Sequence, residues 1–221
     1  MGRSNAPHTL KEKVMPNWCF NNLLLYSNNK DTLENIRKVF CENKLLDYLV
    51  PMPEGLKNQE IDSLPETERE ALEQKNIEQY GSRDWYYWRN KNWGTKWDVG
   101  ADDSKAYENN DYSVQDNIDK NKDEFKYSLK LSFDSAWGPP REAIEKLRDH
   151  NVWFILTYYE GAIGFCGILS SDDQDEWDTS EAPEWIKEEF GAEEIEEEVL
   201  DINNINKKEM IREANTLRSI I

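Results

Sequence analysis

The feature that most constrains the fold is a strict alternation of apolar and polar side chains at residues 125–133. Every second position is apolar: Phe125, Tyr127, Leu129, Leu131 and Phe133. The positions between them are polar: Lys126, Ser128, Lys130 and Ser132. Because successive side chains of a β-strand point to opposite faces, this pattern predicts a strand with one packed face and one solvent-exposed face.

Segments on either side of this strand predict another strand and two helices. The run WCFNNLLLYS at 18–27 is β-rich and partly alternating, which is typical of a strand. A helix is expected from Asp31 to about residue 43, because Asp31 and Glu34 form a capping-box pattern ahead of apolar residues at helical spacing. A second helix is expected at 139–150, where two prolines fit the first turn. Its inward face carries Ala143, Ile144 and Leu147.

Apolar runs and turn residues predict the other elements. The continuous run at 152–160 predicts a buried central strand, and 163–169 a strand that returns beside it. Residues 45–56 are expected to cross the fold and turn at two prolines, and 65–80 to form a surface helix that Gly81 ends. KWDVG is expected to begin a strand. The order strand, helix, strand, strand, helix, strand predicts an α+β, ferredoxin-like fold, an antiparallel sheet covered by two helices.

Five short motifs occur in the order MPNWCFNNLLLYS, LVPMPEGL, NWGTKWD, FDSAWGPP and YYEGAIGFCGIL. In these motifs the chain resembles the YubB-like ferredoxin-like domain family of phages and conjugative plasmids, over about residues 15–169. The resemblance implies the fold and an origin in a mobile genetic element. It transfers no catalytic residue, because the family has no assigned biochemical role. The chain departs from the family's outline at 101–124 and in its acidic C-terminal segment.

The composition changes along the chain predict three parts. Residues 1–14 are polar and aperiodic and are expected to be a flexible leader. Residues 15–171 are expected to form the ferredoxin-like domain, with insertions at about 56–84 and 101–124. Residues 172–221 are expected to form an acidic, partly helical extension.

The rare side chains and the hydropathy of the chain argue against several classes of protein. No apolar run approaches the roughly 20 residues that span a bilayer, so we expect a cytoplasmic protein without membrane contact. Cys19, Cys41 and Cys166 are odd in number and scattered, which favours reduced thiols. His8 and His150 are far apart, and no C-x-x-C or H-x-x-x-H spacing occurs, so we expect neither a metal site nor a cofactor. The oligomeric state stays open.

Most of the negative charge lies in one segment. The formal net charge is -18, and residues 172–201 hold fifteen Asp and Glu against Lys187, a local charge of -14 that leaves -4 for all other residues. Helices are expected near 183–190 and 205–219, and large apolar groups interleave with the acids, so we expect partial order. The segment is interpreted either as a solvated face or as a protein-binding surface. Its candidate binding residues are Asp172, Asp173, Asp175, Glu176, Trp177, Asp178, Glu181, Glu184, Trp185, Glu188, Glu189, Glu193, Glu194, Glu196, Glu197 and Glu198.

The second interpretation leads to the preferred hypothesis about function. Acids on a helix, at 1.5 Å rise per residue, approximate the charge spacing of duplex DNA, which is roughly 1.7 Å per charge. A protein of a mobile element could therefore occupy the nucleic-acid channel of a host defence factor, such as a CRISPR effector or a restriction enzyme. We expect such a protein to be non-enzymatic.

An aromatic and basic cluster at 85–98, WYYWRNKNWGTKWD, supports an alternative function. Its aromatic side chains either build a core or form a face on which single-stranded nucleic acid stacks between basic residues, with the acidic segment as a shield. If the cluster is a strand, one face can be buried and the other open. The candidate residues of this face are Trp85, Tyr87, Trp88, Arg89, Lys91, Trp93, Lys96 and Trp97.

Two pairs of residues are the candidates for catalysis. A desolvated Lys96 could act as a nucleophile or base, with Glu160 as a partner. The commoner role of such a lysine is to lay its stem across an indole. Cys19 and His150 are the only conceivable thiol–imidazole pair, but nothing in the sequence predicts the electropositive pocket that a reactive thiol needs. No catalytic residue is therefore assigned.

Overall fold

The computed structural model of the 221-residue chain describes residues 17–57, 59, 61–101, 112–119 and 122–191. Several predictions lie outside the described residues: the leader at 1–14, half of the insertion at 101–124, the helix at 205–219, and the candidate binding residues Glu193, Glu194, Glu196, Glu197 and Glu198.

Six antiparallel strands form one sheet in the order β2-β3-β1-β4-β5-β6. The strands are β1 (Trp18–Ser27), β2 (Gln115–Asp116), β3 (Tyr127–Ala136), β4 (Trp153–Glu160), β5 (Phe165–Ser170) and β6 (Gln174–Asp178). The four strands β2-β3-β1-β4 and the helices that connect them have the ferredoxin-like arrangement, which confirms the predicted fold class. The strands β5 and β6 extend this sheet beyond β4.

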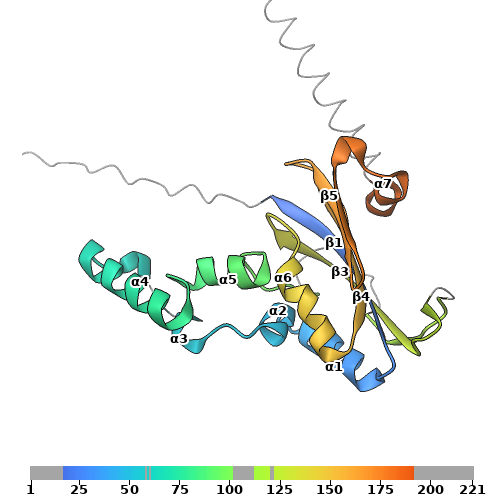
Figure 1. Cartoon of the computed structure of the whole chain (residues 1–221), viewed down its shortest axis with the longest axis horizontal. Coiled ribbons are helices and arrows are strands. Elements are labelled where there is room, and N and C mark those ends of the chain that lie inside the picture. Colours follow the sequence, from blue (N-terminus) through green and yellow to red (C-terminus); the bar gives the residue numbers. More distant parts are fainter. Residues whose placement is uncertain (1–16, 58, 60, 102–111, 120–121, 192–221) are drawn as a thin grey trace, which may run out of the picture.

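Helices cover both faces of the sheet, but unequally (Figure 1). On one face lie α1 (Lys30–Cys41), α2 (Leu45–Leu49), α5 (Trp85–Trp93), and α6 (Arg141–Ile144) with its 3-10 continuation η4 (Glu145–His150). From this layer α3 (Glu54–Lys57), the 3-10 turn η1 (Ile61–Ser63) and α4 (Glu66–Tyr80) extend away from the sheet. The opposite face carries α7 (Glu184–Phe190), which follows the 3-10 turn η5 (Thr179–Glu181).

The alternating segment is confirmed as a strand with one packed face. Leu129, Leu131 and Phe133 of β3 are buried in the main core, whereas Lys130 is exposed on the other face. Phe133 contacts Phe40 of α1 with a distance of 6.0 Å between ring centroids. The pattern of β3 therefore determines which face the helices α1 and α6 cover.

The helix α1 is confirmed, but its predicted capping box is wrong. The N-cap is Asn29, whose side-chain oxygen accepts hydrogen bonds from the backbone N–H groups of Asp31 and Thr32. Asn29 is extended, with φ -113° and ψ 108°, as an N-cap residue must be. Glu34 instead forms an ion pair with Arg37 one turn later. The N-cap of α1 is therefore Asn29, two residues before the predicted Asp31.

Three other segments differ from the sequence-based expectations. KWDVG forms no strand, and the second strand of the fold is β2, which lies inside the predicted insertion at 101–124. Residues 45–49 form α2 rather than a crossing segment. The segment 85–93 is the helix α5, not a strand: Asp84 accepts a hydrogen bond from the Tyr87 N–H at its start, and Gly94 ends it with φ 83°.

The acidic extension begins inside the domain, and the predicted boundary at residue 171 is therefore misplaced. The strand β6 pairs with β5 along its whole length, and α7 packs on the sheet. An edge strand tolerates acidic side chains because they remain in water, and its charge opposes pairing with other chains. The change in composition at residue 171 therefore suggested a domain boundary, but the backbone hydrogen bonds between β5 and β6 continue the sheet across it.

Candidate functional site

The described part of the acidic segment lies on β6, η5 and α7, with β6 as the edge strand of the sheet. Residues 172–191 contain nine acidic side chains against Lys187, a local charge of -8. We call these nine residues the acidic surface: Asp172, Asp173, Asp175, Glu176, Asp178, Glu181, Glu184, Glu188 and Glu189. These members of the predicted binding set do not share one face, because Glu176 contacts Arg141 and Tyr158 on the α6 side of the sheet, whereas Trp177 packs with α7.

A small apolar cluster holds this surface on the sheet. Ile186 of α7 is completely buried against Tyr159 of β4 and Cys166 of β5. Phe190, one helical turn later, stacks on Tyr159 with ring centroids 6.0 Å apart. Positions i and i+4 of a helix share a face, so the remaining faces of α7 are left to the acids. The acidic surface is therefore attached to the fold.

Two tryptophans lie within the acidic surface in different environments. Trp177 of β6 is half-buried against the apolar cluster, whereas Trp185 of α7 is 44% exposed. Their rings meet at 90° with centroids 6.4 Å apart. Trp185 thus stands in solvent, supported from one side by Trp177.

The acids divide into those with internal partners and those without. Glu176 accepts hydrogen bonds from Arg141 and Tyr158, Glu189 from Asn22, and Asp172 from the Trp153 ring nitrogen. Asp178 accepts two hydrogen bonds from Ser180, which lower the pKa of its carboxyl group. Within the described part of the chain, no hydrogen-bond or ion-pair partner is found for Asp175, Glu181, Glu184 and Glu188.

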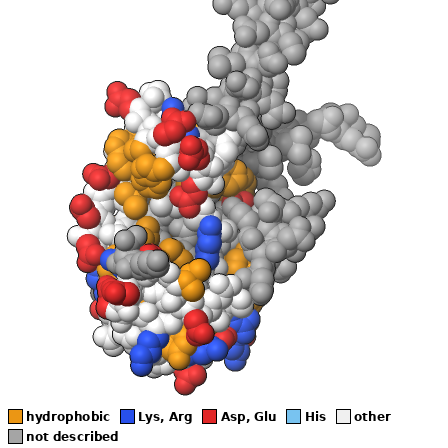
Figure 2. Space-filling view, turned by 90° about the vertical axis from the view of Figure 1, so that its right-hand side faces the viewer, with side chains coloured by type: hydrophobic (Ala, Val, Ile, Leu, Met, Phe, Trp, Pro, Cys, Tyr) orange, Lys and Arg blue, Asp and Glu red, His pale blue; other side chains and the backbone are white. Residues whose placement is uncertain are grey.

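Figure 2 views the molecule from the side that carries α7. Acidic side chains surround a group of exposed hydrophobic side chains in the upper part of this view, at the height of α7 in Figure 1. Most of the visible Lys and Arg side chains lie in the lower part of the view, where Asp and Glu side chains are also present.

The aromatic cluster is mainly structural on one side of α5. Trp88 and Trp93 are buried, and the Trp93 ring nitrogen donates a hydrogen bond to the Val50 carbonyl at 2.8 Å. The Arg89 guanidinium lies 5.1 Å from the Trp85 ring centroid and 4.7 Å from that of Trp93. Its burial lowers the pKa of Arg89. Four members of the predicted nucleic-acid face therefore pack against the rest of the fold: Trp85, Trp88, Arg89 and Trp93. They share one side because of helical spacing, not because of the alternation of a strand.

Other aromatic side chains of this region remain exposed and alternate with basic groups. Arg83 lies 3.5 Å from the Tyr87 ring centroid, and Tyr87 contacts Tyr86 at 5.4 Å. The Lys96 ammonium lies 5.8 Å from the Tyr86 centroid and 4.5 Å from that of Trp97. Trp97 contacts Trp18 of β1 at 5.9 Å. We call this set the aromatic row: Arg83, Tyr87, Tyr86, Lys96, Trp97 and Trp18.

The row contains three residues that sequence reasoning did not include. Trp18 is 79 positions from Trp97 along the chain, and only the tertiary structure brings them together. Arg83 and Tyr86 were left out of the predicted face, although they adjoin it in sequence. Lys91, which was included, is exposed and makes none of the contacts that link the row.

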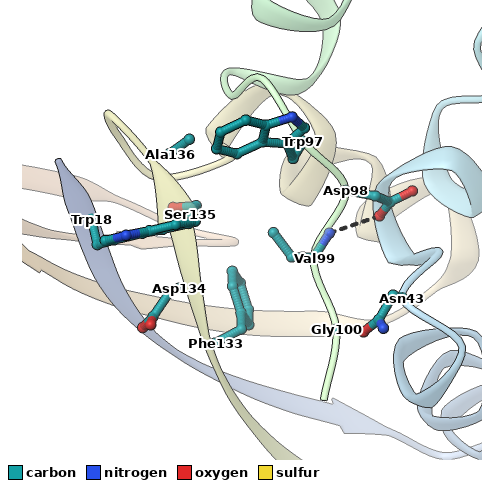
Figure 3. Close-up of a pocket in the computed structure, with 10 residues that line it drawn as sticks. All are labelled: Trp18, Asn43, Trp97, Asp98, Val99, Gly100, Phe133, Asp134, Ser135 and Ala136. Carbon is teal, nitrogen blue, oxygen red and sulfur yellow. Dashed lines mark hydrogen bonds between the residues drawn. The ribbon is translucent and has the colours of Figure 1, made fainter. Parts of the chain in front are cut away.

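A pocket of about 390 Å³ lies at the Trp18 end of the row (Figure 3). It separates β3 from the segment 97–100. Its lining residues are Trp18, Asn43, Trp97, Asp98, Val99, Gly100, Phe133, Asp134, Ser135 and Ala136.

Asp98 fixes the position of the segment that forms one wall of this pocket. Its carboxylate accepts hydrogen bonds from the backbone N–H groups of Leu46 and Asp47, at the start of α2, and from Val99. Burial raises the pKa of Asp98, and these three hydrogen bonds oppose the shift. Gly100 then passes close to α1, where a Cβ atom would lie 2.5 Å from the Phe40 carbonyl oxygen.

The two pairs considered for catalysis are not assembled. Lys96 lies against Tyr86 and Trp97, whereas Glu160 is completely buried and accepts a hydrogen bond from the Ile163 N–H. Cys19 is also completely buried, and burial raises the pKa of its thiol. The His150 ring stacks on Tyr48 at 5.3 Å.

Two searches of the described residues bear on other classes of site. No group of three or more His, Cys, Asp or Glu side chains in the described ranges could hold a metal ion. Within the same ranges, no helix is both long enough and apolar enough to cross a membrane.

Comparisons with known proteins agree with the fold. Residues 114–203 match the family model of the ferredoxin-like domain in Api92-like protein. This match begins just before β2 and passes through β6 and α7, so the acidic surface lies within the matched region. The chain thus contains a ferredoxin-like α+β domain.

Among solved structures, the chain is similar to protein Api92 from Yersinia pseudotuberculosis. The sequences are 12% identical, the alignment covers 75% of this chain and 95% of that chain, and the TM-score is 0.33. No curated protein matches the sequence significantly.

Proposed function

We propose that this protein is a non-enzymatic inhibitor that binds the basic, nucleic-acid-binding surface of another protein through its acidic surface. The observation that carries the proposal is that four acids and Trp185 are exposed on elements that a buried cluster anchors to the sheet; the acids are Asp175, Glu181, Glu184 and Glu188. Carboxylates without internal partners keep their full charge for an oppositely charged surface. An exposed tryptophan supplies the desolvated anchor that such complexes use.

The partner in this proposal is a host defence factor that handles nucleic acid, such as a CRISPR effector or a restriction enzyme. The YubB-like motifs support an origin in a phage or plasmid, whose products meet such factors in the bacterial cytoplasm. The acidic surface would then occupy the channel that normally holds the nucleic acid, because its charges resemble those of the phosphate backbone.

A pair of charge reversals tests this function. Asp175→Lys with Glu188→Lys changes the net charge by +4, and neither residue caps a helix or has an internal partner. The matched control is Glu70→Lys with Glu78→Lys on α4, which makes the same change far from the surface. Binding to a purified CRISPR effector and a restriction endonuclease, measured by calorimetry and by nuclease inhibition, should weaken at least tenfold in the first variant alone.

Two results would refute the proposal. One is equal weakening in both variants, because this would indicate a nonspecific charge effect. The other is the lack of binding by the unaltered chain to any tested basic nucleic-acid-binding protein. Deletion of residues 172–221 is a poor substitute, because it removes β6 and the buried Ile186.

A second candidate function is the binding of single-stranded nucleic acid along the aromatic row. The observation that favours it is that Tyr86, Tyr87 and Trp97 stay exposed while Arg83 and Lys96 lie against their rings. Bases stack on such rings for roughly 1–3 kcal/mol each, and cations between them meet the phosphates. The acids of α7 do not shield this row, because α7 lies on the opposite face of the sheet from α5 (Figure 1).

Substitutions that remove one aromatic ring or one positive charge from the aromatic row test the second candidate function. Tyr86→Ala and Lys96→Ala should each weaken binding of a single-stranded oligonucleotide at low salt, measured by fluorescence anisotropy. Lys91→Ala is the matched control, since Lys91 is exposed on the same helix but outside the row. Identical affinities of all four proteins would exclude the row as the binding site.

A further inference from the structure

The pocket at the end of the aromatic row is built from parts of the chain that are far apart. Its walls come from the start of β1, the end of β3 and the segment 97–100 that runs beside them (Figure 3). Its volume of about 390 Å³ falls within the range of roughly 300–1,000 Å³ that is typical of small-ligand sites.

Aromatic rings form most of the apolar lining of the pocket. Trp18 and Trp97 meet with ring planes inclined by 32°, and Phe133 lies on the other side of the hollow (Figure 3). Trp18 is 44% exposed and Trp97 is 36% exposed. Indoles with this much exposure contribute little to the core, and they are suited to stack on a planar ligand.

Charge differs between the lining of this pocket and the neighbouring Lys96. Asp98 and Asp134 line the pocket, and no Lys or Arg is among the lining residues. The Lys96 ammonium lies 4.5 Å from the ring centroid of Trp97, which is one of the lining residues. A phosphate group is repelled by the acidic lining and attracted to Lys96.

A nucleotide fits both halves of this charge pattern, because it has an uncharged planar base and an anionic phosphate. We propose that the pocket beside Trp18 and Trp97 binds a nucleobase, with the attached phosphate held at Lys96. Ring N–H and amino groups of the base donate hydrogen bonds to backbone carbonyl groups of the lining. The base belongs either to a free nucleotide or to a strand on the aromatic row. Only in the second case does the inference rest on the second candidate function.

Calorimetry of the full chain with the four ribonucleoside monophosphates tests the base site. Trp18→Ala should weaken binding roughly tenfold or more, the loss of one stacking contact. The matched control is Trp185→Ala, because Trp185 has the same 44% exposure but lies on α7, away from the pocket. Binding by Trp185→Ala should equal that of the unaltered chain.

A second pair of variants separates the base from the phosphate. Lys96→Gln should weaken binding of the monophosphates but leave binding of the corresponding nucleosides unchanged, because only the former carry the anion. Lys91→Gln, which removes an exposed lysine outside the row, should change neither.

The outcomes distinguish this inference from the proposed functions. If free nucleotides bind in a way that depends on Trp18 and oligonucleotides do not bind, the pocket is a nucleotide site and the row does not bind a strand. If oligonucleotides bind and Trp18→Ala does not change their affinity, the row binds a strand and the pocket is not a nucleobase site. The inference is overturned if no nucleotide binds at millimolar concentration, if Trp185→Ala weakens binding as much as Trp18→Ala, or if glucose binds with the same dependence on Trp18.

Discussion

The helix α5 and the acidic surface on β6 and α7 are both rich in aromatic and charged side chains, yet they use them in opposite ways. In α5, Trp88 and Trp93 enter the main core, and Arg89 fills the space between two indoles. In α7, the buried residue is Ile186, while Trp185 and most of the acids face solvent.

The difference shows that aromatic content alone does not decide whether a cluster is a core or a contact surface. In α5 the Arg89 guanidinium lies against two rings, where cation–π attraction offsets part of its desolvation. Packed carboxylates would be repelled by the negative ring faces, so the acids of α7 stay outside and only a narrow apolar stripe is buried. We therefore expect substitutions of the buried residues of α5, Trp88 and Trp93, to damage the fold, and substitutions of exposed residues in α7 to damage binding.

The largest expected effect is that of Trp93→Ala. Trp93 is 1% exposed and its ring nitrogen is hydrogen-bonded, so truncation leaves a cavity and an unpaired carbonyl, for a loss of about 3–5 kcal/mol. Urea denaturation measures the free energy of unfolding. Trp185→Ala should lie within about 1 kcal/mol of the unaltered chain, and a comparable loss in both variants would contradict the contrast between the two regions.

A smaller and more local effect is expected for Ile186→Ala. Ile186 is completely buried in a cluster of few residues, so we expect a loss of about 2 kcal/mol, at the lower end for such truncations. Because α7 depends on this contact, hydrogen exchange of residues 184–190 should accelerate more than that of β1 or β4. Uniform acceleration across the sheet would show that α7 is an integral part of the core.

The smallest effect concerns the pH dependence of stability at Asp98, near the junction of the row and the pocket. Burial raises its pKa above the ordinary value of 3.8, so the folded state binds the proton more tightly than the unfolded state. The contribution of Asp98 to stability therefore falls as the pH rises through the window between 3.8 and the raised value.

Asp98→Asn removes this titration. The difference in free energy of unfolding between the unaltered chain and Asp98→Asn should decrease as the pH rises from about 3 to 6. Denaturation at several pH values measures it. An increase over this range would mean that the three backbone hydrogen bonds outweigh burial.

Local patterns predicted much of the fold. The alternation at 125–133, the apolar run at 152–160 and the glycine after residue 80 each correspond to the expected element or end. The strand β2 was missed because it is two residues long and carries no apolar signal. The strand β6 was missed because its acids resemble a solvated segment, although its backbone pairs fully with β5.

The candidate sites were predicted less completely than the fold. The acidic residues were identified individually, but the separation into paired acids such as Glu176 and unpaired acids such as Glu188 depends on neighbours from α6 and β4. Trp18 had no sequence signal for a site, because it reads as an ordinary strand residue. Trp18 contacts Trp97 only because the segment after α5 lies beside β1 in the folded chain.

By itself, the sequence determined the periodicities, the segregation of charge and therefore the kind of sheet and its packed face, since these follow from local geometry and hydropathy. Only the tertiary structure decided which aromatic side chains became core and which became surface. That choice depends on the helical turn of α5, on the narrow apolar stripe of α7, and on contacts between segments far apart in the chain. Burial is a property of the assembled fold, and for that reason two segments that are both rich in aromatic and charged side chains became a packed helix in one place and an exposed acidic surface in another.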